Sequence, residues 1–380
     1  MSSASQGNAD LSRFWRVAAA AVLLAGLVVL GARCWTLRHR AFIGSPDEAA
    51  YAHQADMILA GHGLRVNYIQ HFFRRYDGLL HPADHYGPGY SVLLAPIADA
   101  MPGPPEWAAA LPALAAGSLI LPLLTLLAAG RVGAGPSWAA AAGFFVLLAP
   151  LPQQLSGRVL ADVPFTCLLL AAWLVASGPR PAPTWRGLWT GALMGAAYLL
   201  KAAALLHVPG VLIALWLGTA DGEGDAERRP GPLPLVACAV ALTLVAAPWM
   251  ARNAALFGDP LYSANKHIAA GQDYREDWVE HGLRRVWWAR DTKPPTPGEI
   301  AARYGIGRVA EVWGERLVRA GAGPDVRWLT LALLVGAVCL RRREGWSLAT
   351  FHLSQALLLA MVFPVWSRYL LLLWPAAAAV

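Results

Sequence analysis

Long runs of apolar residues without a charged side chain follow one another through most of this 380-residue chain. A helix needs about 20 such residues to cross the hydrocarbon core of a bilayer. Only helices and closed barrels pair all their backbone polar groups internally, as that core requires. The runs therefore predict an all-α fold, a polytopic bundle of about ten transmembrane helices. They cover residues 17–32, 107–130, 132–157, 163–179, 187–200, 202–220, 230–251, 328–340, 345–367 and 369–380.

The composition agrees with an integral membrane protein. Charged residues make up 14% of the chain and hydrophobic residues 57%, whereas soluble domains have about 25% charged residues. The net charge of +7 comes from basic residues scattered between apolar runs, a pattern typical of membrane topology and not of a nucleic-acid interface. The cysteines lie far apart and show no metal-ligand spacing: Cys34, Cys167, Cys238 and Cys339.

Basic residues in the short loops predict the orientation. Cytoplasmic loops are enriched in Lys and Arg, so we expect the cluster Arg341-Arg342-Arg343 in the cytoplasm. Counting the spans backward from this cluster places the N-terminus in the cytoplasm as well. It places two long polar stretches outside, 33–106 as the first extracytoplasmic loop and 251–327 as the second. We expect one membrane domain over residues 1–380, with the active site outside.

Two further segments bear on this topology. Residues 86–101 are apolar but short and contain Pro88 and Pro96. A span there would reverse the side of everything that follows, so we interpret the segment as a helix that lies in the outer interface or re-enters the membrane. The chain stops inside an apolar run at Val380, and we suspect a fragment of a longer protein.

The segment Ser45-Pro46-Asp47-Glu48 places two adjacent carboxylates just beyond the first apolar run. Ser-x-x-Glu is a helix capping box, and Pro at the first helical position strengthens that interpretation. We expect Glu48 to reach back to the backbone of Ser45 and to leave Asp47 as the freer group. A helix N-terminus favours the ionised form of Asp47, and an ionised carboxylate suits a general base.

The predicted topology collects further charged residues on the same extracytoplasmic side. A charge at the centre of the bilayer costs about 2.5–3.5 kcal/mol, so such residues usually pair or face a cavity. Taken singly, each has a plainer explanation, because cations extend from helix ends to the interface and an acid can cap a helix. Together with Asp47 and Glu48 they predict a site for an anionic, lipid-borne substrate. These residues are Arg158, Asp162, Lys201, Arg252 and Arg368.

Histidines in the first loop leave a metal site open. His81 and His85 are four residues apart and, on one helix face, could bind a metal ion. Pro82 and the pair Pro88-Gly89 favour a loop, in which the histidines contact a phosphate instead. The sequence requires no cofactor, and a divalent metal is an open alternative.

Five of these segments, in their order and spacing, resemble motifs of membrane-embedded C-type (GT-C) glycosyltransferases. More narrowly, they resemble the protein O-mannosyltransferase and lipid A aminoarabinose transferase group. The resemblance covers residues 15–265 well and 366–380 weakly. It rests on Pro46-Asp47-Glu48-Ala49-Ala50-Tyr51, His85-Tyr86-Gly87-Pro88-Gly89-Tyr90, Arg158 to Pro164, Gly191 to Lys201 and Pro248 to Pro260.

The resemblance implies transfer of a sugar, with inversion, from a polyprenyl-phosphate donor to a hydroxyl of a lipid, glycan or protein acceptor. The reaction would take place on the outer face of a bacterial inner membrane. Asp47 is then the general base, with Glu48 and Asp162 as further catalytic candidates. This chain has Tyr86-Gly87-Pro88 where the family often has Lys-Pro-Pro, so His85 is the candidate cation there. The other candidates for binding the leaving phosphate are Arg158, Lys201, Arg252 and Arg368.

The alternative function is a transporter or flippase for lipid-linked or small anionic solutes. Secondary transporters usually show repeat symmetry and polar groups near the bilayer midplane. The unusual charges of this chain instead gather at one interface, and the sequence shows no internal repeat. The sequence therefore favours the transferase.

Overall fold

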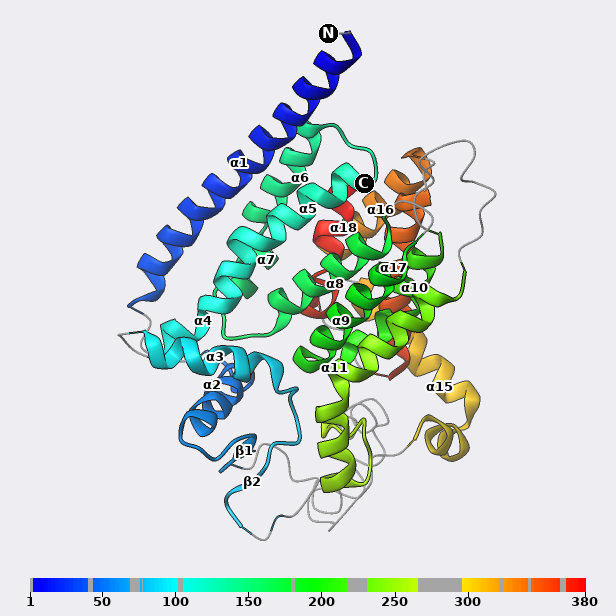
Figure 1. Cartoon of the computed structure of the whole chain (residues 1–380). Coiled ribbons are helices and arrows are strands. Elements are labelled where there is room, and N and C mark those ends of the chain that lie inside the picture. Colours follow the sequence, from blue (N-terminus) through cyan, green and yellow to red (C-terminus); the bar gives the residue numbers. More distant parts are fainter. Residues whose placement is uncertain are drawn as a thin grey trace.

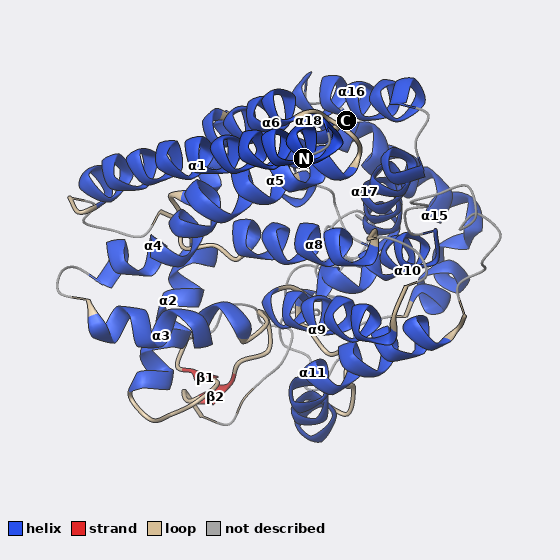
Figure 2. Cartoon of the chain, turned by 45° about the horizontal axis from the view of Figure 1, so that its top comes forward, coloured by secondary structure: helices blue, strands red, loops and turns tan. Residues whose placement is uncertain are grey.

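The computed structural model describes residues 3–39, 44–68, 76, 78–101, 105–178, 182–217, 231–265, 296–321, 324–340, 343–362 and 367–380. These residues form a bundle of helices with one short two-stranded sheet (Figures 1 and 2). Helices cover all ten of the apolar runs, so the predicted all-α class is confirmed. Outside the described residues lie residues 218–230, Arg341 and Arg342 of the predicted cytoplasmic cluster, and residues 266–295 of the second loop.

Three helices of the described chain are long and apolar enough to cross a membrane. They are Ser12–Leu37 within α1 (Ser3–Leu37), Trp107–Arg131, and Leu233–Phe257, which is α11. Trp107–Arg131 runs through α4 (Pro105–Ala115), η1 (Ala116–Ile120) and α5 (Leu121–Arg131). The structure thus supports a membrane location with three spans that meet this criterion, against about ten predicted.

A bent pair of helices would give a fourth span. α6 (Pro136–Leu148) and α7 (Pro150–Ser156) meet at 56°. Proline lacks a backbone N–H and disfavours helical geometry in the residue before it, and Ala149 before Pro150 is accordingly extended (φ −64°, ψ 138°). The remaining predicted runs form α8 (Asp162–Ala176), α9 (Thr184–Leu200), η2 (Ala202–His207), α10 (Val208–Leu217), α16 (Pro324–Leu340), α17 (Arg343–Val362), η3 (Ser367–Leu370) and α18 (Leu373–Ala379).

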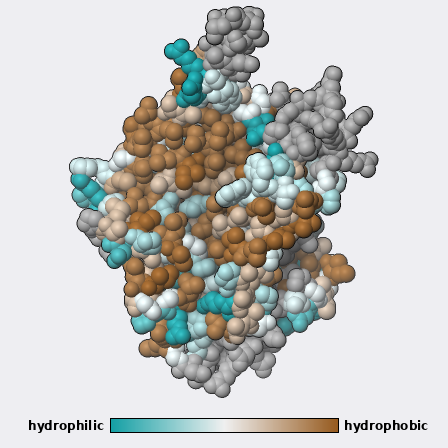
Figure 3. All heavy atoms as spheres, viewed as in Figure 1, coloured by the Kyte–Doolittle hydropathy of each residue, from teal (hydrophilic) through white to brown (hydrophobic). Residues whose placement is uncertain are grey.

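The outside of the bundle is apolar and its interior is closely packed. Large apolar side chains lie exposed on α1, α9 and α11, among them Val28, Trp189 and Leu244. Figure 3 shows hydrophobic residues over much of the middle of one face, with hydrophilic residues nearer its ends. Such a surface suits lipid and not water.

Glycines bring α9 and α11 into close contact. Gly187 and Gly191 lie one turn apart on α9, and a Cβ at these positions would stand 2.0 Å from the Pro234 carbonyl oxygen and 2.1 Å from that of Cys238. Membrane helices lack a hydrophobic driving force between them, and small residues let their backbones approach. The glycines therefore fix α9, which ends just before Lys201, against α11.

The first loop folds into two helices and a hairpin-like pair of strands at one end of the bundle (Figure 1). α2 (Pro46–Leu59) is followed by β1 (Arg65–Val66) and β2 (His81–Pro82), which pair antiparallel. α3 (Gly89–Ala100) confirms the helix predicted over 86–101. Its 12 residues span about 18 Å, less than the hydrocarbon core of about 30 Å.

The second loop contributes α15 (Pro297–Gly321), which is kinked at Gly305, where φ is 80°. Thr296 and Glu299 form a capping box at its start: the amide of Glu299 donates to the Thr296 hydroxyl at 3.2 Å, and the amide of Thr296 donates to the Glu299 carboxylate at 2.6 Å. α15 packs against α17 and α16. The predicted polar loop is therefore partly a helix.

Candidate active site

Glu48 is buried at the start of α2 and joins the first loop to the bundle. Ser45 is the N-cap, and its hydroxyl oxygen accepts a hydrogen bond from the Glu48 amide at 3.4 Å, which is one half of the predicted capping box. The Glu48 side chain contacts the Ser45 hydroxyl where a contact with the Ser45 backbone was predicted. The Glu48 carboxylate accepts from the Ser45 hydroxyl at 3.1 Å, from Arg158 Nε at 2.9 Å and from the Val159 amide at 3.0 Å. Its side chain is 0% exposed. These contacts tie α2 to the turn between α7 and α8.

Asp47 faces a different group of residues. The Tyr86 hydroxyl donates to its Oδ1 at 2.6 Å, and Arg368 Nη1 of η3 donates to its Oδ2 at 2.6 Å. The Asp47 side chain is 27% exposed, so it is more accessible than Glu48 while it is held by two partners. Burial alone would raise the pKa of Asp47. The hydrogen bond from Tyr86, the ion pair with Arg368 and the nearby His85 outweigh it and hold this pKa below its ordinary value.

Lys201 and Asp162 form a further ion pair, which shares a pocket with Arg368. Lys201 is extended (φ −149°, ψ 128°) and separates α9 from η2, as the sequence predicted for the gap between two runs. Its Nζ lies 2.7 Å from Oδ1 of Asp162, the first residue of α8. Asp162 is buried and Lys201 nearly so. The pair joins the start of α8 to the break between α9 and η2.

Arg368 and the Lys201–Asp162 pair share a pocket, which we call the cationic pocket. Its other walls are mainly apolar, with the hydroxyl of Thr166 and the fully buried ring of His207 as further polar groups. Arg368 therefore lies between this pocket and Asp47. The segments around residues 47, 162, 201 and 368 are brought together from distant parts of the chain, as the predicted topology required.

Arg158 and Arg252 have other surroundings. Arg158 pairs with Glu48. Arg252 Nη2 donates to the Leu64 carbonyl at 3.1 Å, and its guanidinium lies 4.4 Å from the centre of the Trp249 ring. Its charge acts on Tyr76 and Asp84 of the first loop. Neither arginine lines the cationic pocket.

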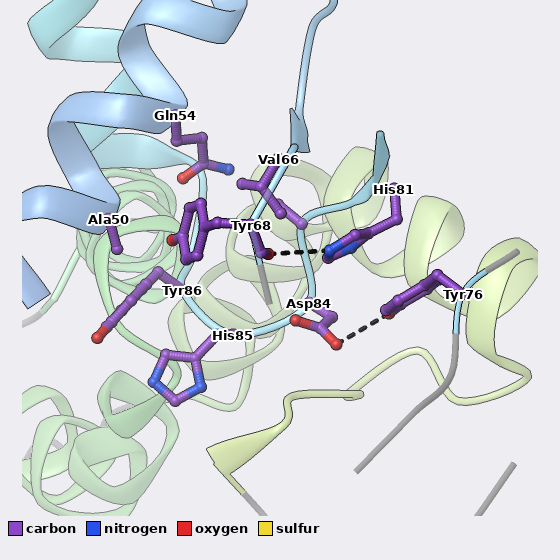
Figure 4. Close-up of a pocket in the computed structure, with 10 residues that line it drawn as sticks. Ala50, Gln54, Val66, Tyr68, Tyr76, His81, Asp84, His85 and Tyr86 are labelled. Atoms are coloured by element: carbon purple, nitrogen blue, oxygen red, sulfur yellow. Dashed lines mark hydrogen bonds between the residues drawn. The ribbon is translucent and has the colours of Figure 1, made fainter. Parts of the chain in front are cut away.

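The two histidines proposed as metal ligands do not share a helix face. His81 lies in β2, stacks on Tyr76 at 4.0 Å and has its Nε2 3.0 Å from the Tyr68 carbonyl oxygen. His85 lies beyond β2 and lines a pocket in the first loop (Figure 4). The helical i, i+4 alternative therefore does not hold, and the structure has the loop that Pro82 and Pro88-Gly89 favoured. The described part of the chain contains no cluster of three or more His, Cys, Asp or Glu side chains placed to hold a metal ion.

Close backbone contact positions the segment that carries His85 and Tyr86. A Cβ on Gly87 would lie 2.3 Å from the Leu199 carbonyl oxygen, at the end of α9. The His85 carbonyl accepts hydrogen bonds from Ser263 at 3.1 Å and from Asn265 at 3.3 Å, both just beyond α11. This segment is thus held between the ends of α9 and α11, which explains why it needs glycine.

Tyr86 and His207 are site residues that the sequence did not single out. Tyr86 stands where this chain departs from the Lys-Pro-Pro pattern, and that departure was a usable signal. His207 lies within an apolar run, and only the fold shows that it lines the same pocket as Lys201.

No protein-family model and no curated protein sequence matches the chain. Solved structures do. ArnT from Cupriavidus metallidurans in the apo state matches with a TM-score of 0.55 at 16% identity, over 95% of this chain and 59% of that one. The Archaeoglobus fulgidus oligosaccharyltransferase matches in its apo form with a TM-score of 0.59 at 12% identity, over 96% of this chain and 50% of that one.

The chain has the fold of the GT-C glycosyltransferases. The same oligosaccharyltransferase in complex with zinc and sulfate also matches, with a TM-score of 0.53 at 15% identity, over 93% of this chain and 48% of that one. The chain spans about half of the oligosaccharyltransferase and 59% of ArnT. The predicted GT-C fold is confirmed.

Proposed function

We propose that this GT-C membrane domain transfers a sugar from a polyprenyl-phosphate donor to an acceptor hydroxyl on the extracytoplasmic face, with inversion. The observation that carries the proposal is the position of Asp47, held between Tyr86 and Arg368 next to a pocket lined by Lys201. Both structural neighbours, ArnT and the oligosaccharyltransferase, are glycosyltransferases, which supports a transferase function.

Lys201 and Arg368 are suited to the leaving phosphate. When the bond between the anomeric carbon and the phosphate oxygen breaks, negative charge gathers on that oxygen, and fixed cations lower the energy of this state. Both side chains line the cationic pocket at its polar end. In this proposal Arg158 holds Glu48 by an ion pair, and Arg252 holds the first loop through the Leu64 carbonyl. The charge of His85 contributes to the lowered pKa of Asp47.

Asp47 is the proposed general base. It accepts the proton of the acceptor hydroxyl as the new bond to the anomeric carbon forms. Its pKa, lowered by Tyr86 and Arg368, keeps it ionised at neutral pH. A phosphate that binds near Arg368 offsets part of the positive charge acting on Asp47, which raises its pKa and makes it a stronger base. Asp162, paired with Lys201, is proposed to orient that cation.

The test is donor turnover by the protein in proteoliposomes. A panel of hexose and pentose polyprenyl phosphates is supplied with extracted cell-envelope lipids, glycans and proteins as acceptors, and mass spectrometry follows polyprenyl phosphate release and product. Asp47→Asn should lower transfer by about 10²- to 10⁴-fold. Asp99→Asn, on the exposed face of α3, is the matched control and should not change it.

Two results would count against the proposal. Unchanged transfer by Asp47→Asn would remove its role as base. Movement of intact donor across the vesicle membrane without release of polyprenyl phosphate would favour the transporter alternative. A parallel series with a chelator measures whether a divalent metal is needed.

A further inference from the structure

A second pocket lies in the first loop (Figure 4), and one of its lining residues, Tyr86, is hydrogen-bonded to Asp47. We call it the aromatic pocket. Three tyrosines line it, Tyr68, Tyr76 and Tyr86, together with the polar side chains of Gln54, Asp84 and His85. The phosphate proposal does not use this pocket, and its chemistry differs from that of the cationic pocket.

Gln54 presents a buried hydrogen-bond donor to the aromatic pocket. The residue is 2% exposed. Its Oε1 lies 3.0 Å from the Ser91 hydroxyl, which also lies 3.0 Å from the Tyr51 carbonyl oxygen. Its Nε2 has no hydrogen-bond partner among the described residues. A buried N–H without a partner is costly, and a ligand hydroxyl in the pocket would satisfy it.

Neighbouring contacts hold the rings of the pocket in fixed orientations. Tyr76 stacks on His81 with 6° between their planes, and its hydroxyl donates to Asp84 Oδ2 at 2.9 Å. Tyr86 packs on Tyr51 with 4.7 Å between ring centres. Pre-organised side chains lose little conformational entropy when a ligand binds. The aromatic pocket is therefore suited to binding and not only to packing.

This set of groups matches a neutral sugar ring. The C–H faces of a pyranose pack on aromatic rings, and its hydroxyls both donate to a carboxylate and accept from an amide. Among the described residues no Lys or Arg lines the aromatic pocket, in contrast to the cationic pocket with Lys201 and Arg368. Polar side chains, among them Gln54 and Asp84, line the pocket, whereas a sheet edge that binds peptides offers backbone groups.

The two pockets meet at Asp47. Its Oδ1 is bonded to Tyr86, which lines the aromatic pocket, and its Oδ2 to Arg368, which lines the cationic pocket. Inversion requires the acceptor to attack from the face opposite to the leaving phosphate. We propose that the aromatic pocket binds the acceptor and that this acceptor is a glycan or glycoside, not a peptide. The inference rests on the proposed function, since it assigns the acceptor side of the same reaction.

Binding is tested without any donor, so that the outcome does not depend on turnover. Saturation-transfer NMR on the protein in nanodiscs uses a panel of methyl hexopyranosides and a short Ser/Thr-containing peptide as probes. We expect a signal from at least one glycoside and none from the peptide. Gln54→Met and Asp84→Ala should each weaken glycoside binding by about tenfold. Lys201→Met, in the cationic pocket, should leave it unchanged.

The outcomes separate this inference from the proposed function. A signal from the peptide alone, or glycoside binding that both Gln54→Met and Asp84→Ala leave intact, would overturn the glycan acceptor. Melting temperatures identify a variant that fails to fold, in which case the other variant decides. Glycoside binding that persists without transfer from any donor would count against the proposed function and not against the pocket.

Discussion

Asp47 and Glu48 are consecutive in the chain, yet their carboxylates have different surroundings. Glu48 is 0% exposed and accepts hydrogen bonds from Ser45, Arg158 and Val159. Asp47 is 27% exposed and contacts Tyr86 and Arg368 at the junction of two pockets. Neighbouring positions on a helix do not face the same side. One carboxylate therefore fixes the loop to the bundle, and the other faces the candidate site.

The ion pairs Asp47–Arg368 and Glu48–Arg158 should respond differently when the arginine is replaced. Arg368→Met removes the partner of Asp47 and a phosphate ligand, so transfer should fall by about 10²- to 10³-fold. Because Asp47 is 27% exposed and keeps the hydrogen bond from the Tyr86 hydroxyl, the folding free energy should fall by about 1–2 kcal/mol, less than for a fully buried carboxylate that loses its cation. Initial rates and melting temperatures in nanodiscs measure both. An unfolded Arg368→Met protein would contradict this division, and Arg308→Met on α15 is the control.

Arg158→Met should have the opposite effect. It leaves the buried Glu48 carboxylate without its cation, which costs about 3 kcal/mol of folding free energy. Transfer per folded molecule should stay within about threefold of the unchanged protein. Chemical denaturation checks the first value. Adding Glu48→Gln should recover part of the loss, because the two residues are coupled; strictly additive losses would argue against the pair.

Gly87→Ala tests how the segment that carries His85 and Tyr86 is held. The added Cβ would meet the Leu199 carbonyl oxygen at 2.3 Å, and overpacking of this kind costs about 1–3 kcal/mol. Transfer should fall too, since Tyr86 would move relative to Asp47. Gly78→Ala is the matched control in the same loop, because its Cβ would meet nothing within 4 Å. Equal melting temperatures for both variants would be the contrary result.

Tyr86→Phe should give the smallest effect at neutral pH and a clear one in acid. The pKa of Asp47 in the folded protein is depressed. The contacts of its carboxylate therefore contribute their full stability above the ordinary pKa of a carboxyl group, and this contribution is lost as pH falls through the depressed pKa. Removing the Tyr86 hydroxyl takes away one cause of the depression. The acid limb of kcat/KM should therefore move to higher pH. A limb that stays in place would show that Asp47 does not set it.

The sequence predicted the helices and much of the site, since apolar runs and charge position are local signals. Counting spans predicted one group of residues on the extracytoplasmic side, and the fold brings four of them together: Asp47, Asp162, Lys201 and Arg368. The capping box at Ser45 was readable from four residues. Each of these features depends on short stretches of chain or on the periodic alternation of spans.

Pairwise partners were not predictable in the same way. Arg158 and Arg252 carry the same charge and lie near helix ends as Arg368 does, yet they contact Glu48 and the Leu64 carbonyl. Which cation meets which acid depends on the packing of distant helices, which no local pattern records. The helical alternative for His81 and His85 does not hold, because the β1–β2 pairing makes His81 part of a strand, and the loop favoured by Pro82 is what forms.

The most direct test compares Asp47→Asn and Glu48→Gln in one reconstituted preparation, with transfer rate and melting temperature measured on the same samples. We predict that Asp47→Asn keeps the melting temperature and loses transfer, whereas Glu48→Gln lowers the melting temperature and keeps transfer per folded molecule. Equal loss of transfer by both variants at an unchanged melting temperature would contradict the separate roles of the two carboxylates.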